Sequence, residues 1–251
     1  MISLANRSVL ITGGSRGIGR AAAILMAKAG ADIVFDYFKS HVAAEEVKAE
    51  IESLGRRAIA IPGNIAEDQH CKELVDTTCR LFGKIDVLVN NAGIWTYAPI
   101  DEMKEEVYRE TIDINLSGLI YTTRYAVQQM KKQGHGKIIN LSSTAGQRGE
   151  ALHSHYAATK GAIISLTKSW SSELAPVIQV NCVAPGWVDT DMSAEPLSNP
   201  DDYKQITSII PMRRVATAEE IAGPILFLAS DLASFITGEI LNVNGGSVLV
   251  G

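Results

Sequence analysis

The sequence predicts an α/β fold, in which a doubly wound parallel sheet of about seven strands carries helices on both faces. Apolar runs of four to six residues alternate with longer amphipathic stretches from one end of the chain to the other. These runs lack polar alternation, as expected for strands that are buried on both faces. A glycine-rich turn joins the first run to the first amphipathic stretch, a connection typical of this fold class.

The expected elements follow one another in alternation. We expect strands at residues 8–12, 32–35, 58–61, 86–89, 137–141, 178–183 and 239–243. Helices are expected over residues 17–29, over a charged stretch that ends at Gly55, and over a stretch around Leu74 and Leu81. Longer helical patterns cover 101–132, 153–174 and 217–229, and the last begins with a capping box of Thr217 and Glu220.

One weakly patterned segment interrupts this alternation at residues 192–212. It holds Pro196, Pro200 and Pro211, and an insert of ~20 residues in a compact domain is usually an active-site lid or a binding loop. No linker, repeat or low-complexity tract occurs elsewhere. We therefore expect residues 1–251 to form a single domain with a substrate loop near 192–212.

Composition excludes several classes of protein. Lys and Arg total 23 against 28 Asp and Glu, a formal charge of −5, and without a basic tail we expect no nucleic-acid partner. No run reaches the ~18–20 apolar residues of a membrane span, and residues 1–7 lack the layout of a signal peptide. We therefore expect a cytoplasmic protein with no membrane partner. Three scattered cysteines predict neither a disulfide framework nor a zinc site.

The glycine-rich turn is the segment Thr12-Gly-Gly-Ser-Arg-Gly-Ile-Gly19. Gly13 permits a tight turn, Gly17 lets the backbone approach a pyrophosphate, and Gly19 lets the helix pack closely on the strand. The free N–H groups and the positive end of that helix attract phosphate. The spacing departs from the usual G-x-G-x-x-G, and structural turns also use glycine. It is the position after the first strand that favours a phosphate site.

Tyr156 and Lys160 stand four residues apart, on one face of an expected helix. Taken alone they are equally compatible with an ordinary surface pair. Other motifs in the chain favour a functional role for this pair. Together with it they occur in the order Gly13–Gly19, Asn90-Asn-Ala-Gly93, Asn115, Ser143, Tyr156 with Lys160, and Pro185-Gly186. All but Asn115 lie at the carboxyl ends of expected strands or on the helix that follows, where ligands bind in an open α/β sheet.

This ordered set resembles the short-chain dehydrogenase/reductase superfamily, in its single-domain branch. The similarity extends from Ser8 to Gly246, and β-ketoacyl-acyl-carrier-protein reductases are the nearest general match, through Asn90–Gly93, Val180–Gly186 and Asn244–Gly246. The resemblance implies a Rossmann fold and an NAD(P)(H)-dependent oxidoreductase that interconverts a ketone and a secondary alcohol by hydride transfer.

The resemblance also implies four catalytic roles. Tyr156 is the general acid in reduction and the base in oxidation, and Lys160 is expected to lower its pKa from the ~10 of a free phenol and to hold the nicotinamide ribose. Ser143 donates a hydrogen bond to the substrate oxygen. Asn115 holds a water that links Lys160 to solvent. Ser142 competes with Ser143 for the serine role, but the thirteen-residue spacing to Tyr156 favours Ser143.

Cofactor contacts follow from the same resemblance. Those to the phosphates are expected from Gly13, Ser15, Arg16, Gly17, Ile18 and Gly19, and those to the adenine from Asn64 and Ile65. Asn91, Ala92 and Gly93 pass the adenine ribose, Tyr156 and Lys160 are near the nicotinamide, and Pro185, Gly186, Val188 and Thr190 hold the carboxamide. Asn64 stands where the family usually has aspartate.

The second strand bears on the choice between NADP(H) and NAD(H). Tyr37, not an acid, aligns with the position where NAD-dependent members carry a carboxylate for the ribose. Arg16 and Lys39 are placed to reach a 2′-phosphate. We therefore expect NADP(H) to be preferred over NAD(H). Asp36, one residue before Tyr37, points elsewhere if side chains alternate along the strand; a ribose contact from Asp36 is the alternative.

Trp95, His153 and Trp187 are the candidate substrate contacts. Trp187 directly follows the Pro-Gly turn, and Trp95 follows the Asn-Ala-Gly turn after Ile94; loop aromatics that cover core are the alternative interpretation. His153 and His155 have no third ligand at suitable spacing, so no metal site is expected.

We expect the substrate to be a small molecule or an acyl thioester. The family match favours 3-oxoacyl-acyl-carrier-protein reduction, with Lys131, Lys132 and Lys137 as part of a basic patch for the acidic carrier. Residues 174–179 lack the basic residue that such reductases often carry, so a sugar, polyol or small cyclic ketone is the alternative. A non-catalytic dinucleotide-binding sensor is a third hypothesis, but such proteins typically lose the tyrosine or the lysine.

The two long helical patterns carry more apolar surface than one sheet face can cover. Ile120, Val127, Ile163, Leu166 and Trp170 spread over a wide arc of residues 101–132 and 153–174. We therefore expect a homotetramer or a dimer that uses these helices, as the resemblance also implies.

Overall fold

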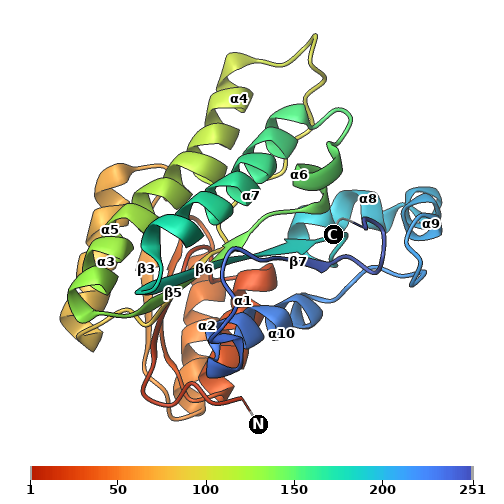
Figure 1. Ribbon diagram of the computed structural model, residues 1–251. Coiled ribbons are helices and arrows are strands. Elements are labelled where there is room, and N and C mark those ends of the chain that lie inside the picture. The colour runs from red at the N-terminus through yellow and green to blue at the C-terminus, as the bar shows by residue number, and fades with distance from the viewer. Residues whose placement is uncertain (1, 250–251) are drawn as a thin grey trace.

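Seven parallel strands form one sheet in the computed structural model, which describes residues 2–249. Their order across the sheet is β3-β2-β1-β4-β5-β6-β7 (Figure 1). The strands are β1 Ser8–Ile11, β2 Asp32–Tyr37, β3 Ala58–Pro62, β4 Val87–Asn90, β5 Gly136–Leu141, β6 Ile178–Pro185 and β7 Ile240–Val243. The sequence prediction of a doubly wound parallel sheet is therefore confirmed.

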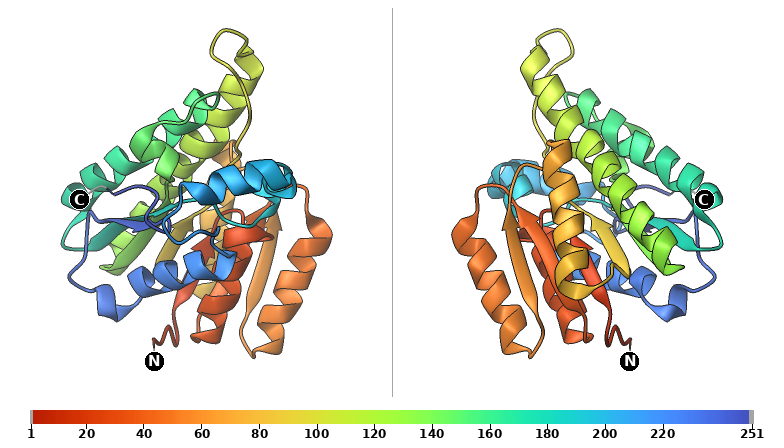
Figure 2. Two further views of the ribbon diagram at one scale, coloured as in Figure 1. Left: turned by 90° about the vertical axis from the view of Figure 1, so that its right-hand side faces the viewer. Right: turned by 90° about the vertical axis from the view of Figure 1, so that its left-hand side faces the viewer.

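Helices cover both faces of the sheet. Their bounds are α1 Gly17–Lys28, α2 His41–Ser53, α3 Asp68–Phe82, α4 Glu105–Ile112, the π-helix η1 Asp113–Ser117, α5 Gly118–Gln133, α6 Thr144–Arg148, α7 Ser154–Leu174, the 3₁₀-helix η2 Asp191–Ser193, α8 Ala194–Ser198, α9 Pro200–Ser208, α10 Ala218–Ala229 and the 3₁₀-helix η3 Asp231–Ala233. Helices α1, α2 and α10 lie on one face and α3, α5 and α7 on the other (Figure 2).

The buried strands divide the core into two layers. On β1, Val9 and Ile11 pack with the face that α1 and α10 cover, whereas Leu10 packs with the face that α3 and α5 cover. All three side chains are completely buried. This division explains why the strands are apolar without alternation, because each face has its own helical layer.

The sequence suggested an irregular segment at residues 192–212, but most of this segment is helical. It folds into the end of η2 and the short helices α8 and α9. Asn199 caps α9 by accepting hydrogen bonds from the backbone N–H groups of Asp201 and Asp202, with Pro200 in the first turn, a standard helix start. The expected helix at 101–132 begins later, at Glu105, and the π-helix η1 divides it into α4 and α5.

The strand order places the site. β1 lies between β2 and β4, so the chain leaves the carboxyl ends of β1 and β4 toward opposite faces, and the crevice between them is where ligands bind in such sheets.

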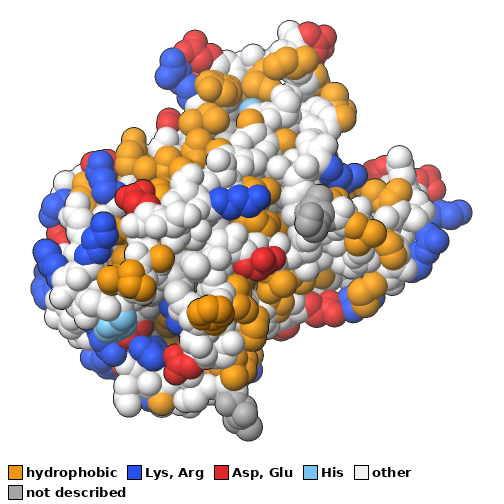
Figure 3. Space-filling model, viewed as in Figure 1, with side chains coloured by type: hydrophobic (Ala, Val, Ile, Leu, Met, Phe, Trp, Pro, Cys, Tyr) orange, Lys and Arg blue, Asp and Glu red, His pale blue; other side chains and the backbone are white. Residues whose placement is uncertain are grey.

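Over the middle of the face that α5 and α7 form, charged side chains are sparse (Figure 3). No helix within residues 2–249 is long and apolar enough to cross a membrane.

Candidate active site

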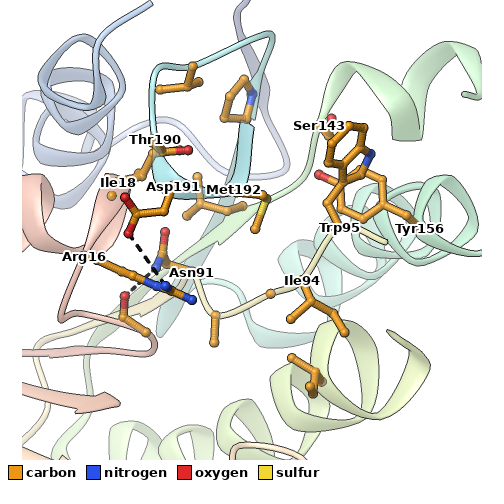
Figure 4. Close-up of a pocket in the computed structure, with 18 of the residues that line it drawn as sticks. Arg16, Ile18, Asn91, Ile94, Trp95, Ser143, Tyr156, Thr190, Asp191 and Met192 are labelled. Atoms are coloured by element: carbon orange, nitrogen blue, oxygen red, sulfur yellow. Dashed lines mark hydrogen bonds and ion pairs between the residues drawn. The ribbon is translucent and has the colours of Figure 1, made fainter. Parts of the chain in front are cut away.

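A cavity of about 550 Å³ lies at the carboxyl edge of the sheet. It brings together most residues that the sequence singled out. Of the expected cofactor contacts, all but Gly19 line it, and so do Ser143, Trp95 and Trp187. Asn115 and His153 lie outside this lining. Figure 4 shows Ser143, Tyr156 and Trp95 at one side of the pocket and Arg16 and Asp191 at the other.

The glycine-rich turn has the shape of a phosphate cradle. Gly13 has a φ of +68°, a conformation that favours glycine, and a Cβ at Gly19 would overlap the Gly13 carbonyl oxygen. Arg16 precedes α1 without a side-chain cap, so the first N–H groups of this helix are free of side-chain partners. These residues fit a dinucleotide pyrophosphate, because free helix N–H groups and the helix dipole attract anions.

The Asp36 side chain fixes this turn through a hydrogen bond to the backbone of Gly13. Its Oδ1 accepts a hydrogen bond from the Gly13 backbone N–H at 2.6 Å, and its Oδ2 lies 3.4 Å from His70 Nε2. The side chain is 2% exposed. Both oxygens are thus engaged inside the protein, as the alternation along β2 predicts.

Asn91 and Thr12 tie the ends of β1 and β4 together. Asn91 Nδ2 donates to the carbonyl oxygens of Thr12 and Gly13, at 2.9 and 3.0 Å. Thr12 Oγ1 accepts from the backbone N–H groups of Asn91 and Ala92, both at 3.0 Å. The crevice therefore has a rigid floor, which pre-organises the cavity.

The Ser143 and Tyr156 side chains meet at the inner end of the cavity. Burial raises the pKa of Tyr156 to about 12, the nearby Glu150 charge adds to this effect, and a hydrogen bond from Ser143 opposes it. The expected lowering of this pKa is therefore wrong for the protein by itself, because desolvation of the phenolate dominates. Tyr156 is held as a phenol at neutral pH, the form that donates a proton.

Lys160 lies beside Tyr156, one helical turn further along α7. Its Nζ donates to the Leu141 carbonyl oxygen at 2.9 Å and lies 5.6 Å from the centroid of the Tyr156 ring. Burial lowers the pKa of Lys160 to about 8. Ser142, the competing serine, donates to the Lys160 carbonyl oxygen at 2.7 Å, so it holds α7 in place while Ser143 faces the cavity.

Asn115 occupies the middle of the π-helix η1 and is 1% exposed. Its Oδ1 accepts from the Ile94 N–H at 2.8 Å and its Nδ2 donates to the Ile94 carbonyl at 2.9 Å. The side chain thereby fixes the strand extension that passes beneath Lys160. A π-helical turn often marks a functional position, and here it brings Asn115 to Ile94.

An aromatic wall closes the end of the cavity beside Ser143 and Tyr156. Trp95 stacks on His153, with ring centroids 4.3 Å apart and planes 7° apart, and meets Trp187 edge to face at 5.8 Å. His153 is 8% exposed and supports Trp95 from behind, rather than lining the pocket as expected. Within residues 2–249 no group of three His, Cys, Asp or Glu side chains is arranged to hold a metal ion.

Glu150 is the residue of this wall that the sequence did not indicate. It lines the cavity, and its Oε2 accepts a hydrogen bond from Trp95 Nε1 at 3.2 Å. The two residues are 55 positions apart, so no local pattern connects them. Glu150 follows α6 in the turn before α7, which explains how it reaches the Tyr156 side of the pocket.

Arg16 and Asp191 face each other across the opposite end. The Arg16 guanidinium lies 3.6 Å from the Asp191 carboxylate, and both side chains are mostly exposed (Figure 4). Tyr37, Lys39 and Ser40 line the same end. Tyr37 is tied to His41, with its hydroxyl 2.8 Å from the ring Nδ1. This end presents cationic and hydroxyl groups to a ligand, together with the Asp191 carboxylate.

The fold, the phosphate cradle and the Ser–Tyr–Lys group on one cavity define a nicotinamide-dependent dehydrogenase or reductase. A family model described as enoyl-(acyl carrier protein) reductase matches residues 13–247. The chain belongs to this family, which is part of the short-chain dehydrogenases/reductases, and it is an oxidoreductase that binds NAD(P).

Similar proteins differ in the substrates that their names state. The chain is 41% identical over 251 residues to a 3-oxoacyl-[acyl-carrier-protein] reductase of Synechocystis, covering 99% of this chain and 100% of that one. It is 40% identical over 245 residues to an L-rhamnose 1-dehydrogenase (NAD(P)(+)) of Sphingomonas, covering 97% and 96%. A Beutenbergia cavernae protein assigned as an NAD(P) dependent gluconate 5-dehydrogenase, solved with NADP at low occupancy, superposes with a TM-score of 0.92 at 35% identity, covering 98% of each chain.

Proposed function

We propose that this protein interconverts a small hydroxylated ketone and the corresponding secondary alcohol, with NADP(H) preferred over NAD(H). In oxidation the alcohol carbon loses a hydride and the hydroxyl loses a proton, giving the carbonyl compound, the reduced cofactor and one proton. When bound, the nicotinamide ring supplies or accepts the hydride. The meeting of Ser143 and Tyr156 on one wall of the cavity, with Lys160 behind them, is the observation that carries the proposal.

The chain's own residues handle the proton. Tyr156 donates it to the carbonyl oxygen in reduction, which suits a phenol whose pKa is raised to about 12 by burial. Ser143 donates a hydrogen bond to the same oxygen and positions it. The Lys160 ammonium supports the phenolate that forms, since an adjacent positive charge favours the anion. Asn115 is a positioning residue that holds the backbone at Ile94 beneath this group.

NADP(H) preference rests on the end of the cavity near Arg16. The carboxylate of Asp36 is turned toward Gly13 and His70, so it is engaged away from a ribose. Arg16 and Lys39 line the cavity there, and guanidinium and ammonium groups bind phosphate well.

A 3-oxoacyl thioester on acyl carrier protein is the second candidate, favoured by the identity to the Synechocystis reductase. The basic patch expected for the carrier is not beside the cavity. Lys131 and Lys132 lie in the last turn of α5, and Lys137 lies at the start of β5 with its ammonium on the Ser230 carbonyl. These residues are at the amino edge of the sheet, whereas the cavity is at the carboxyl edge. This placement favours the small hydroxylated substrate.

Replacing Tyr156 by Phe tests the proposal. The substitution keeps the ring but removes the transferable proton, so we expect kcat to fall ~10²–10⁴-fold while NADPH binding, measured by fluorescence titration, is unchanged. The assay follows NADPH at its absorbance maximum with sugars, polyols, small ketones and an acetoacetyl thioester. Near-wild-type turnover of the variant would remove Tyr156 from the acid/base role, and no turnover of any substrate by the wild type would reject the proposed function.

A further inference from the structure

A carboxylate without a cationic partner stands in the substrate end of the cavity. Glu150 is partly buried and lines the cavity together with Trp95, Trp187 and Tyr156. Its Oε2 is fixed by the Trp95 indole N–H at 3.2 Å. Within the part of the chain that the structure describes, Glu150 forms no salt bridge and its Oε1 has no hydrogen-bond partner. An ionised carboxylate accepts hydrogen bonds at both oxygens, so one acceptor is left for a ligand.

The surroundings of that acceptor specify the chemistry of the ligand. The orientation of the Trp95 ring is fixed by His153, which stacks on one of its faces, by Trp187, whose ring plane is turned by 83°, and by the Glu150 carboxylate. A rigid indole face beside a fixed hydrogen-bond acceptor suits a molecule with an apolar C–H face and a rim of hydroxyl groups. An acyl chain in this position would leave Glu150 Oε1 desolvated without a hydrogen bond, which costs free energy.

We propose that Glu150 is the specificity-determining residue of the substrate subsite, where its Oε1 accepts a hydrogen bond from a hydroxyl group of a sugar or polyol that lies against Trp95. This inference rests on the proposed oxidoreductase function and narrows its substrate class. A site built to pair with a substrate hydroxyl discriminates strongly against analogues that lack it, because its own polar group is then left unpaired. Glu150 therefore favours polyhydroxylated substrates over acyl thioesters.

The same carboxylate is electrostatically coupled to the reacting group. The Glu150 charge contributes to the raised pKa of Tyr156, so a neutral side chain at position 150 lowers that pKa and makes the phenolate available at lower pH. The other charged or titratable groups around the phenol are Lys160 and His155 on α7, His153 at the N-cap of α7, Arg148 at the end of α6, and Glu110 on α4. A Glu150 substitution leaves all of them in place.

The first test compares Glu150→Gln with wild type on two kinds of substrate. For an aldohexose and a pentitol we expect kcat/KM to fall ~10- to 150-fold, the effect of one hydrogen bond to a charged group. For ethyl acetoacetate, which has no hydroxyl group to pair with Glu150, we expect the loss in kcat/KM at pH 7 to be much smaller than for the two hydroxylated substrates. In a series of monodeoxy hexoses, the analogue that lacks the hydroxyl group bound by Glu150 should have a lower kcat/KM than the parent hexose with wild type. With Glu150→Gln, the same analogue and the parent hexose should have similar kcat/KM values. Glu106→Gln, an exposed carboxylate on α4 outside the cavity, is the matched control.

Two readouts separate this role from a merely structural one. Glu150→Gln should shift the acid limb of kcat/KM for polyol oxidation to lower pH, whereas Glu106→Gln should not. Titration with the aldohexose should change the intrinsic fluorescence of Trp95 and Trp187 in wild type and do so more weakly in Glu150→Gln, at saturating NADP⁺. Equal losses on hydroxylated and unhydroxylated substrates would overturn the role of Glu150 while the oxidoreductase proposal stands. A wild type that turns over only the acetoacetyl thioester would overturn both the role of Glu150 and the proposed hydroxylated substrate, in favour of the second candidate.

Discussion

Burial without a countercharge governs the two titratable residues at the centre of the site. Tyr156 and Lys160 are 8% and 5% exposed, and desolvation disfavours the charged form of each, so the pKa of the phenol rises and that of the ammonium falls. At pH 7 Tyr156 is therefore a neutral phenol, whereas Lys160 is still mostly an ammonium but loses its proton more readily than an exposed lysine. In the proposed oxidation, Lys160 and the oxidised cofactor together would supply the positive charge that favours the phenolate.

This arrangement predicts that Lys160 lowers stability while it serves catalysis. No carboxylate forms a salt bridge with Lys160 among residues 2–249, and its ammonium has only the Leu141 carbonyl as a hydrogen-bond partner. We expect Lys160→Met to raise the free energy of unfolding at pH 7 by about 1–3 kcal/mol, as measured by urea denaturation, and to lose most of the activity.

The sign of the pH dependence follows from the lowered pKa. Folded Lys160 titrates at about pH 8, and an unfolded lysine titrates at ~10.4. Between these two values the unfolded chain binds more protons than the folded one. The free energy of unfolding of wild type therefore rises with pH relative to that of the variant. The advantage of Lys160→Met should therefore shrink from pH 7 to 9.5. Lys168→Met, at an exposed position on the same helix, should show neither effect. A variant less stable than wild type at pH 7 would contradict the argument.

At the scale of elements, the segment from β6 to α9 closes over the cofactor end of the cavity. Asp191 begins η2 and pairs with Arg16 across the opening. Thr190 and Ser193 form a capping box that fixes this start. The ion pair joins the glycine-rich turn to α8 and α9, so a 2′-phosphate that recruits Arg16 must compete with the Asp191 carboxylate.

We therefore expect Arg16 and Asp191 to affect NADPH in opposite directions. Arg16→Ala should reduce kcat/KM for NADPH ~10- to 150-fold, as loss of a charged hydrogen bond implies, and leave that for NADH nearly unchanged. Asp191→Asn should tighten NADPH binding a few-fold, since exposed pairs are weak, and leave NADH binding unchanged in fluorescence titrations. Arg20→Ala, whose guanidinium pairs with Glu50 on α2, is the control. A wild type that prefers NADH, or equal losses for both cofactors, would instead assign the ribose to Asp36.

Elements whose signals are local could be predicted from the sequence. The expected strands agree with the observed ones to within one or two residues at each end, because a strand buried on both faces needs a continuous apolar run. The glycine turn and the carboxyl-edge motifs likewise predicted most of the cavity lining. The start of α9 also had a local signal, Asn199 followed by Pro200, which the density of prolines around it obscured.

Features that depend on distant contacts could not be read from the sequence. The π-helix η1 is a local register change whose main consequence, the contact of Asn115 with Ile94, spans 21 residues. The Trp95–Glu150 hydrogen bond spans 55 residues. His153, which we expected to contact the substrate, instead stacks on Trp95 and supports it. The pKa of Tyr156 depends on total burial, which only the packed structure reveals.

At the scale of the molecule, the face that α5 and α7 form has apolar side chains that the fold leaves half-buried. Ile163, expected on this surface, is 1% exposed and belongs to the core with Leu119. Ile120, Val127, Leu166 and Trp170 pack against the core but remain partly exposed. Charged side chains are sparse over the middle of this face (Figure 3), as at surfaces that bind a second subunit.

We expect this face to join two copies of the chain. A second apolar surface around the strongly exposed Leu232 and Phe235 should extend the dimer to a tetramer. Light scattering at micromolar concentration should give the mass of a dimer or tetramer. Leu166→Glu should reduce that mass, because a stable interface buries ~800 Å² per partner and tolerates no unpaired charge at its centre. Val42→Glu, at an exposed apolar position on α2, should leave the mass unchanged. Because α7 carries Tyr156 and Lys160, separated subunits should also lose activity; a wild-type monomer of full activity would refute this assembly.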